Sequence, residues 1–161
     1  MKILHGAEEK EAMKFIDEAA RVAQNSKCDR KKCGSVIVKD GKIIGEAFNG
    51  PPGNLESQRR CSYSKDSYHT KLTDKSCCIH AEERAIMLTL RTNPEKIIGS
   101  RLYFARLDEH GKKEPAGKPW CTLCSKMSLE AGIKEFVLWH KEGITVYDTE
   151  EYNTLSFQYK E

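Results

Sequence analysis

The chain contains the stretch Cys78-Ile79-His80-Ala81-Glu82 and, far downstream, the stretch Pro119-Trp120-Cys121-Thr122-Leu123-Cys124. A His followed two positions later by a Glu is a weak signal alone, and so is one Cys-x-x-Cys. In this order, however, they offer three zinc ligands, His80, Cys121 and Cys124, with an acid beside them. The combination predicts a zinc site at which an amino group is removed by hydrolysis.

The local context of the three ligands supports this interpretation. Each stretch follows a loop and stands at the start of a segment whose apolar residues have helical spacing. The ligands would therefore project from helix N-termini, where the positive field favours thiolate over thiol. Cys121 and Cys124 would lie one turn apart on the same helix face, close enough to bind one ion. Three protein ligands leave zinc a fourth position for water, as in catalytic zinc sites.

Glu82 lies two residues past the His and need not bind the metal. Zinc lowers the pKa of a water molecule from about 15.7 to about 7, so hydroxide exists at neutral pH. The role we expect for Glu82 is to take the water proton and deliver it to the ring nitrogen and to the departing amine. H-x-E with a later P-C-x-x-C is the signature of zinc nucleobase deaminases, although Trp120 here separates the Pro from the first Cys.

Each motif alone has a simpler explanation. His80 and Glu82 could be an ordinary helix-opening pair, and Cys121 with Cys124 could be a redox pair or half of a structural zinc site. The order of the motifs and the helix start at both favour the catalytic explanation. A non-catalytic, zinc-stabilised binding module stays open as an alternative, but it would have no use for a carboxylate at position 82.

Length and composition fit a single zinc-dependent deaminase domain over residues 1–161. The chain is 39% hydrophobic and 32% charged, which argues against extensive disorder, and a net charge of +3 is too small for a duplex-binding protein. The N-terminal residues lack the apolar core of a signal peptide, and no later apolar run is long enough to span a bilayer. We therefore expect a cytoplasmic protein, in which metal binding and catalysis explain clustered cysteines better than disulfides do.

The pattern of apolar residues predicts an α/β fold. Two runs rich in Val and Ile flank Asp40-Gly41, which supplies the positive φ angles of a tight hairpin turn. Helices are expected over residues 7–25, from 80 to about 92 and over 121–131, and further strands over 101–107, 135–139 and 143–147. This order favours a three-layer α/β/α sandwich around a mixed sheet of about five strands. Residues 49–76 show no period and indicate a long loop, either disordered or pinned, for example by a metal.

Further stretches carry a resemblance to a known family. They are Ser26-Lys27-Cys28, Cys33-Gly34-Ser35-Val36-Ile37-Val38-Lys39-Asp40-Gly41-Lys42-Ile43-Ile44, Phe48-Asn49-Gly50-Pro51-Pro52, Ile79-His80-Ala81-Glu82 and Ala131-Gly132-Ile133-Lys134-Glu135. From about residue 20 to 137 the chain resembles the cytidine and deoxycytidylate deaminase superfamily. The combination of His-Ala-Glu with Cys-x-x-Cys is specific to that superfamily. Asn-Gly-x-Pro indicates its deoxycytidylate deaminase branch. The resemblance implies a cytidine deaminase-like fold.

The resemblance also implies roles for the matching positions. His80, Cys121 and Cys124 would hold the catalytic zinc, and Glu82 would be the proton shuttle. Asn49 would contact the sugar of the nucleotide.

Other positions border the same substrate site. Ala81 is the middle residue of the His-Ala-Glu motif. Trp120 directly precedes the ligand Cys121, and its ring could stack on the base or intrude on the pocket. Phe48 stands where the branch usually has Tyr. The loop 108–118 is longer and more charged than expected for the branch, and with Trp120 it bears on which base enters.

A second, structural zinc is implied because some members of the branch carry one. The matching positions are Cys28, Cys61 and Cys77 or Cys78, with His69 as a further candidate. Such a site would explain how the long polar loop is pinned. The alternative is that Cys77 and Cys78 are merely small buried residues.

Two groups of residues are candidates for lesser roles. Candidates for phosphate recognition are Arg30, Lys31, Lys32, Arg59 and Arg60, although each alone is more simply explained as solvated surface. The aromatic residues near the C-terminus are Tyr147, Tyr152, Phe157 and Tyr159. They could cap the site or pack on a partner subunit, but core packing is the simpler account.

The expected activity is zinc-dependent hydrolytic deamination of a pyrimidine nucleotide, dCMP to dUMP with release of ammonia. The same chemistry on another nucleoside, a base, or adenosine or cytidine in RNA stays open, although the mild charge and the lack of a basic aromatic stripe argue against RNA. The expected partners are a small-molecule nucleotide or nucleoside and further copies of the chain, without a membrane or nucleic acid.

Overall fold

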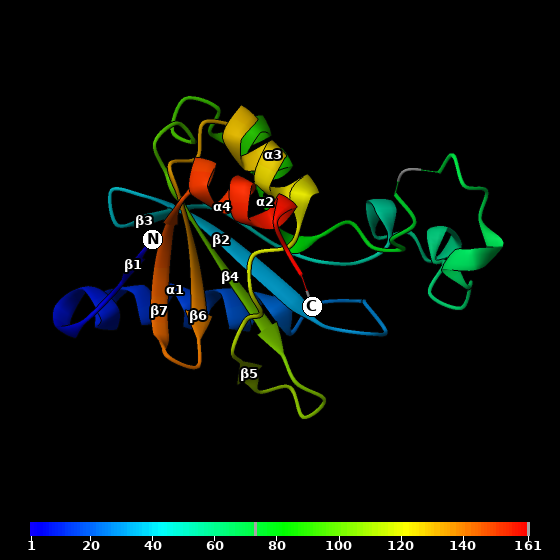
Figure 1. The fold of residues 1–161 in the computed structure, drawn as a ribbon, viewed down its shortest axis with the longest axis horizontal. Coiled ribbons are helices and arrows are strands. Elements are labelled where there is room, and N and C mark those ends of the chain that lie inside the picture. Colours follow the sequence, from blue (N-terminus) through cyan, green and yellow to red (C-terminus); the bar gives the residue numbers. More distant parts are fainter. Residues whose placement is uncertain (73, 161) are drawn as a thin grey trace.

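The computed structural model describes residues 1–72 and 74–160, which form a mixed sheet with helices on both faces (Figure 1). The strands are β1 (Lys2–Ile3), β2 (Cys33–Lys39), β3 (Lys42–Phe48), β4 (Arg101–Leu107), β5 (Lys113–Glu114), β6 (Glu135–His140) and β7 (Gly143–Asp148). The helices are α1 (Gly6–Ala23), α2 (Ala81–Thr92), α3 (Thr122–Glu130) and α4 (Thr149–Phe157). The expected α/β/α sandwich is confirmed.

The order of strands in the sheet is β1-β7-β6-β4-β2-β3, and β5 adds to β4. β4 and β6 pair in parallel, and the other strand pairs of the described residues are antiparallel. The five longer strands are those expected from the sequence, while β1 and β5 are two-residue strands that the sequence did not predict. At the β2–β3 turn, Asp40 and Gly41 have φ angles of 49° and 72°, as the Asp-Gly pair predicts.

Each face of the sheet has its own apolar core, because side chains alternate along the strands. On one face Ile16 of α1 packs with Val36 of β2. On the other face Ile86 of α2 packs with Leu102 of β4 and Phe136 of β6. Figure 1 shows α1 alone on the first face and α2, α3 and α4 together on the second.

Two glycines permit close approach of a helix to each face. A Cβ at Gly34 would lie 2.0 Å from the carbonyl oxygen of Ala19 in α1, and one at Gly45 would lie 1.8 Å from Oγ1 of Thr89 in α2. A larger residue at Gly34 would displace α1, because the contact there is with backbone, whereas one at Gly45 would displace the Thr89 side chain. The second contact fixes α2 against the β2–β3 hairpin.

The C-terminal helix α4 is the one helix of the described residues that the sequence did not predict. Its Tyr152 is buried and stacks on Phe136, with ring centroids 4.0 Å apart and an interplanar angle of 13°. Tyr147 is also buried, whereas Phe157 and Tyr159 are exposed. Tyr147 and Tyr152 therefore belong to the core, which is the simpler account given for this segment, and Tyr152 also lines the cavity described below.

Residues 49–80, which we call the excursion, leave the α/β/α sandwich at one end and return to it (Figure 1). They contain three short 3-10 helices, Pro52–Asn54, Glu56–Gln58 and Lys65–Ser67. At the base of this excursion, Gly50 and Ile79 exchange backbone hydrogen bonds of 3.0 and 3.3 Å. The guanidinium of Arg84 in α2 donates to the carbonyl oxygens of Gly50 and Pro51. The excursion is thereby joined to the start of α2.

Candidate active site and metal-binding clusters

The three expected zinc ligands come from the N-terminal ends of α2 and α3. His80 is the N-cap of α2, and its backbone N–H donates to Oε2 of Glu83 at 2.8 Å. Cys121 is the N-cap of α3, and its thiol accepts the backbone N–H of Cys124 at 3.4 Å. Because each helix begins at a ligand, the local sequence that starts the helix also orients the ligand.

The ligand atoms converge. Nδ1 of His80 lies 3.2 Å from Sγ of Cys121 and 3.3 Å from Sγ of Cys124, and the two sulfurs are 2.9 Å apart. Both cysteines are buried and neither forms a disulfide. One imidazole nitrogen and two thiol sulfurs around a single point are a donor set that zinc binds, so these residues fit the metal. We call them the catalytic cluster.

The members of the catalytic cluster shift one another's protonation. The hydrogen bond with Cys124 lowers the pKa of the Cys121 thiol to about 5, with a further contribution from His80, although burial opposes the shift. The hydrogen bond with Cys121 in turn raises the pKa of Cys124 and raises the pKa of His80 to about 9. Thiolate, the form that binds metal, is therefore favoured at Cys121.

Glu82 lies in the first turn of α2 and is buried, yet it lines the same cavity as His80 and Cys121. Burial raises the pKa of its carboxyl to about 7, and the charge of His80 partly opposes this shift. The carboxyl group is thus close enough to His80 and Cys121 for their charges to affect its pKa, and it lines the cavity. This is the arrangement expected of a proton carrier.

The cavity has a volume of about 320 Å³. Phe104, Leu138 and Tyr152 give it apolar walls, and the Trp120 side chain, which is 57% exposed, borders it. The ring of Trp120 lies edge-on to that of His80, with centroids 6.0 Å apart. Apolar walls that lead to one buried acid suit a flat heteroaromatic ring.

Most of the charged side chains that line the cavity are positively charged. Apart from Glu82 and His80, those that line it within the described ranges are cationic: Arg30, Lys31, Arg60, Lys65, Lys75, Arg106 and Lys118. Three of the five phosphate candidates named from the sequence are in this group, whereas Lys32 and Arg59 are not. Arg59 instead forms ion pairs with Asp29 and Glu56.

Asn49 and Ala81, two of the expected substrate-binding residues, both line the cavity. Oδ1 of Asn49 accepts hydrogen bonds from the backbone N–H of Cys33 at 2.8 Å and from the hydroxyl of Ser26 at 2.6 Å. Its Nδ2 donates to the carbonyl oxygen of Lys31 at 2.9 Å. The amide therefore holds the loop before β2 in place, with one N–H left for another partner.

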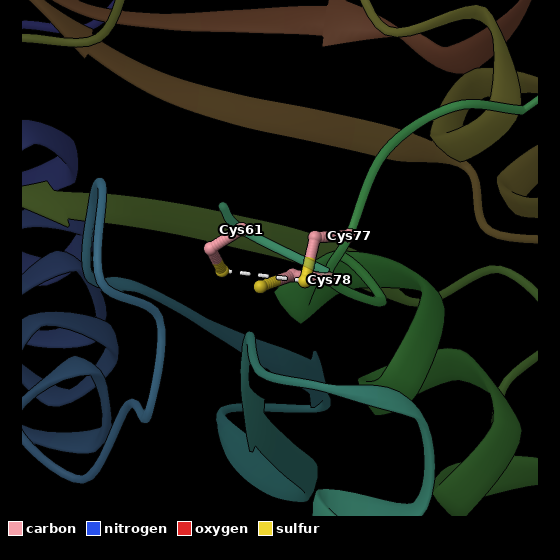
Figure 2. A group of neighbouring side chains, drawn as sticks. All are labelled: Cys61, Cys77 and Cys78. Atoms are coloured by element: carbon pink, nitrogen blue, oxygen red, sulfur yellow. Dashed lines mark hydrogen bonds between the residues drawn. The ribbon is translucent and has the colours of Figure 1, made fainter. Parts of the chain in front are cut away.

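The remaining expected metal ligands gather where the excursion returns to the sandwich. Figure 2 shows Cys61, Cys77 and Cys78, and the sulfurs of Cys61 and Cys77 are 3.3 Å apart. All three sulfurs lie within 4.8 Å of one another. Cys28 is close to them, because its thiol, after burial, is the largest cause that raises the pKa of the Cys78 thiol. The structure thus brings together four cysteines, Cys28, Cys61, Cys77 and Cys78, which we call the loop cluster, and all four line the same cavity as His80 and Cys121.

His69, the further candidate for this second site, is not among the residues that gather there. It is exposed, and its Nδ1 accepts the backbone N–H of Lys71 at 3.1 Å. Cys33, the seventh cysteine, belongs to neither cluster but lines the cavity.

Two cavity residues on β4, Phe104 and Arg106, were missed by the sequence analysis. The period-two alternation of a strand places them on one face, and that signal was present in residues 101–107. Which face of the strand meets α2 depends on long-range packing, so the alternation alone could not assign them to a site.

Comparisons with known proteins agree with this geometry. The family description "Cytidine and deoxycytidylate deaminase zinc-binding region" matches residues 9–140. The chain is 31% identical over 135 residues to a deoxycytidylate deaminase of Mycobacterium phage D29, covering 80% of this chain and 93% of the relative. No helix found in residues 1–72 and 74–160 is both long enough and apolar enough to cross a membrane.

Solved structures are similar as well. The dCMP deaminase of cyanophage S-TIM5, in complex with dCMP and dUMP, has a TM-score of 0.50 and 28% identity, covering 83% of this chain and 82% of that one. A cytidine deaminase from Burkholderia pseudomallei has a TM-score of 0.58 over 87% of this chain and 94% of its own, and at 18% identity it supports the fold alone. The chain belongs to the cytidine and deoxycytidylate deaminase family defined by this zinc-binding region.

Proposed function

We propose that this chain is a deaminase that converts dCMP to dUMP and releases ammonia. The observation that carries the proposal is the position of Glu82, which is buried, lies close to a convergent His-Cys-Cys ligand set and lines a cavity with apolar walls. Two similar proteins described as deaminating or binding dCMP support the choice of substrate.

The chemistry divides between the metal and the chain. A zinc ion held by His80, Cys121 and Cys124 supplies an activated water at neutral pH. Through a carboxylate oxygen, Glu82 would accept the proton that water gives up when its oxygen bonds to C4 of the base. The same carboxyl group would pass this proton to ring nitrogen N3, and would then carry the proton of the new C4 hydroxyl to the amino group, so that the C4–N bond breaks, ammonia leaves and a C4 carbonyl remains.

The walls of the cavity would orient the nucleotide. Phe104, Leu138 and Tyr152 exclude water from the base, and the exposed ring of Trp120 is placed to stack on it. The free N–H of the Asn49 amide would contact the sugar. Ala81, at the first position of α2, leaves room for the base beside the catalytic cluster.

The loop cluster would hold a second, structural zinc. Four cysteine thiols are a donor set for a closed zinc site, in which no position is left for water. Cys28 belongs to the sandwich side of the excursion, and the other three belong to the excursion itself. A metal held by all four would therefore tie the excursion to the body, where it lines the cavity.

Two further properties belong to the same proposal. Cysteines that are all free fit the reducing cytoplasm. Exposed apolar side chains on α2, Met87, Leu88 and Leu90, would be covered in a homo-oligomer. Sedimentation of the zinc-loaded protein at several concentrations tests the second statement, and a monomer at all of them contradicts it.

A substrate panel tests the proposed function. The zinc-loaded chain is incubated with dCMP, CMP, dCTP, deoxycytidine, cytosine and adenosine, and released ammonia is measured. We expect dCMP to have the highest kcat/KM. Turnover of another compound in preference to dCMP would reassign the substrate, and no turnover of any of them would favour the zinc-stabilised binding module.

A further inference from the structure

Arg106 is a cationic residue on the floor of the cavity with a fixed position relative to the base site. It lies at the end of β4, two residues after Phe104, so both side chains are on the same face of the sheet and about 7 Å apart along the strand. In the neighbouring strand its partner in register is Cys33, which also lines the cavity. A base against Phe104 and Glu82 would therefore direct the rest of the nucleotide toward Arg106.

The Arg106 side chain is oriented by the segment that follows β4. Its Nε donates to the carbonyl oxygen of Pro115 at 3.1 Å and lies 3.0 Å from Oε1 of Glu114. The two terminal Nη groups have no hydrogen-bond partner among the described residues. An arginine held through Nε, with both Nη groups available, presents the planar fork that binds a phosphate in bidentate fashion.

Glu114 also holds a second cation at the same place. Nζ of Lys31 lies 2.6 Å from Oε1 of Glu114, and Lys31 lines the cavity as Arg106 does. The backbone carbonyl of Lys31 is in turn fixed by Asn49. One carboxylate thus positions two cations, and the group retains a net positive charge toward the cavity.

This arrangement also gives a reason for the long charged loop 108–118. The loop forms β5, which pairs Glu114 with Arg106, and its end is tied to β6 by a 2.7 Å hydrogen bond from the Ala116 N–H to the Trp139 carbonyl oxygen. Without β5 there would be no acid to orient the arginine.

We infer that Arg106, oriented by Glu114 and assisted by Lys31, binds the phosphate of the nucleotide and makes the site prefer a nucleotide to a nucleoside. The inference rests on the proposed deaminase function. Arg106 and Lys31 touch the substrate, and Glu114 is a positioning residue. The other cations of the cavity would add long-range attraction.

The test compares a substrate with and without phosphate. Steady-state kinetics of the zinc-loaded full chain are measured on dCMP and on deoxycytidine. In Arg106→Gln, KM for dCMP should rise by about 10- to 100-fold, the effect of losing a charge-assisted bidentate contact, while kcat/KM for deoxycytidine changes far less. Arg21→Gln is the matched control, because Arg21 pairs with Glu18 and Glu46 and does not line the cavity.

The positioning role of Glu114 has its own readout. Glu114→Gln should raise KM for dCMP less than Arg106→Gln does, leave kcat nearly unchanged, and have no further effect when Arg106 is already Gln. If Arg106→Gln does not fold, Arg106→Lys keeps the charge without the fork and should show a smaller rise in KM for dCMP alone.

Binding of dUMP and deoxyuridine, measured by calorimetry, separates this inference from the proposed function. Weaker binding of dUMP to Arg106→Gln with unchanged binding of deoxyuridine supports the phosphate site even if the chain deaminates none of the compounds. Equal losses for dCMP and deoxycytidine, or an unchanged affinity for dUMP, would overturn it.

Discussion

The catalytic cluster and the loop cluster have similar ligands, but the structure around the ligands differs in burial and in secondary structure. His80, Cys121 and Cys124 lie at the starts of helices that pack on the core, and both cysteines are buried. The cysteines of the loop cluster are half-buried. From this difference we propose that the fold prepares the first site, whereas the second site would need a metal to be ordered.

Polar contacts also hold the excursion near the loop cluster, among them the ion pair of Arg59 with Asp29. The Arg59 guanidinium donates to the carbonyl oxygen of Lys27 at 2.8 Å, and that of Arg30 donates to the carbonyl oxygen of Cys61 at 3.2 Å. Exposed contacts of this kind contribute little to stability. Three predictions test whether the two clusters differ as proposed, and a fourth tests the role of Trp120 beside the catalytic cluster.

The largest effect is expected from Cys124→Ser. Loss of this buried ligand should remove the catalytic zinc and lower turnover of dCMP by more than the roughly 100- to 10,000-fold that a positioned proton carrier provides. Metal analysis and ammonia release check both statements. A variant that keeps its turnover would show that Cys124 does not hold the catalytic metal.

A smaller loss is expected from Cys61→Ser in the loop cluster. The variant should lose one zinc per chain, and turnover should fall by roughly 10- to 100-fold through misplacement of the cavity wall. Cys33→Ser is the control for metal content, because Cys33 belongs to neither cluster. Equal metal content in Cys61→Ser and the unmodified chain would remove the second zinc.

Removal of metal should affect the two regions differently. With a chelator, amide hydrogen exchange should accelerate across the excursion, while α2 and α3 remain protected because their cores persist. Trypsin should then cleave at Arg59, Arg60 or Lys65. Equal acceleration in α2 and the excursion would mean that the fold does not prepare the catalytic cluster.

The smallest effect is expected from Trp120→Ala. If the exposed ring stacks on the base, its loss should cost about 1 kcal/mol, or roughly fivefold in KM for dCMP, with both metals retained. Trp120→Phe should restore most of the affinity. A lower KM in Trp120→Ala would instead mean that the ring obstructs the pocket.

The residues of the site that could be predicted are those that lie a few positions apart in the sequence, within one motif. His80, Glu82, Cys121 and Cys124 fall within two short motifs at helix starts, and the Asp40-Gly41 turn fixed the hairpin before any packing was known. In each case chain neighbours determine the geometry, so the sequence pattern is sufficient.

Other features depend on contacts between distant residues. Helix α4 has little apolar periodicity, and it is Tyr152 stacked on Phe136 that holds it to the sheet. β5 is too short to predict and forms because β4 offers an open edge to Lys113 and Glu114. Arg106 is a candidate for substrate binding because the packing of α2 on β4 places this face of the strand in the cavity.

The most direct test of the account compares the unmodified chain with Glu82→Gln. Zinc content, dUMP formation and ammonia release are measured together on dCMP. We predict equimolar dUMP and ammonia from the unmodified chain, and for Glu82→Gln the same zinc content with turnover reduced roughly 100- to 10,000-fold. Near-normal turnover by Glu82→Gln, or ammonia release from neither protein, would contradict the proposed chemistry.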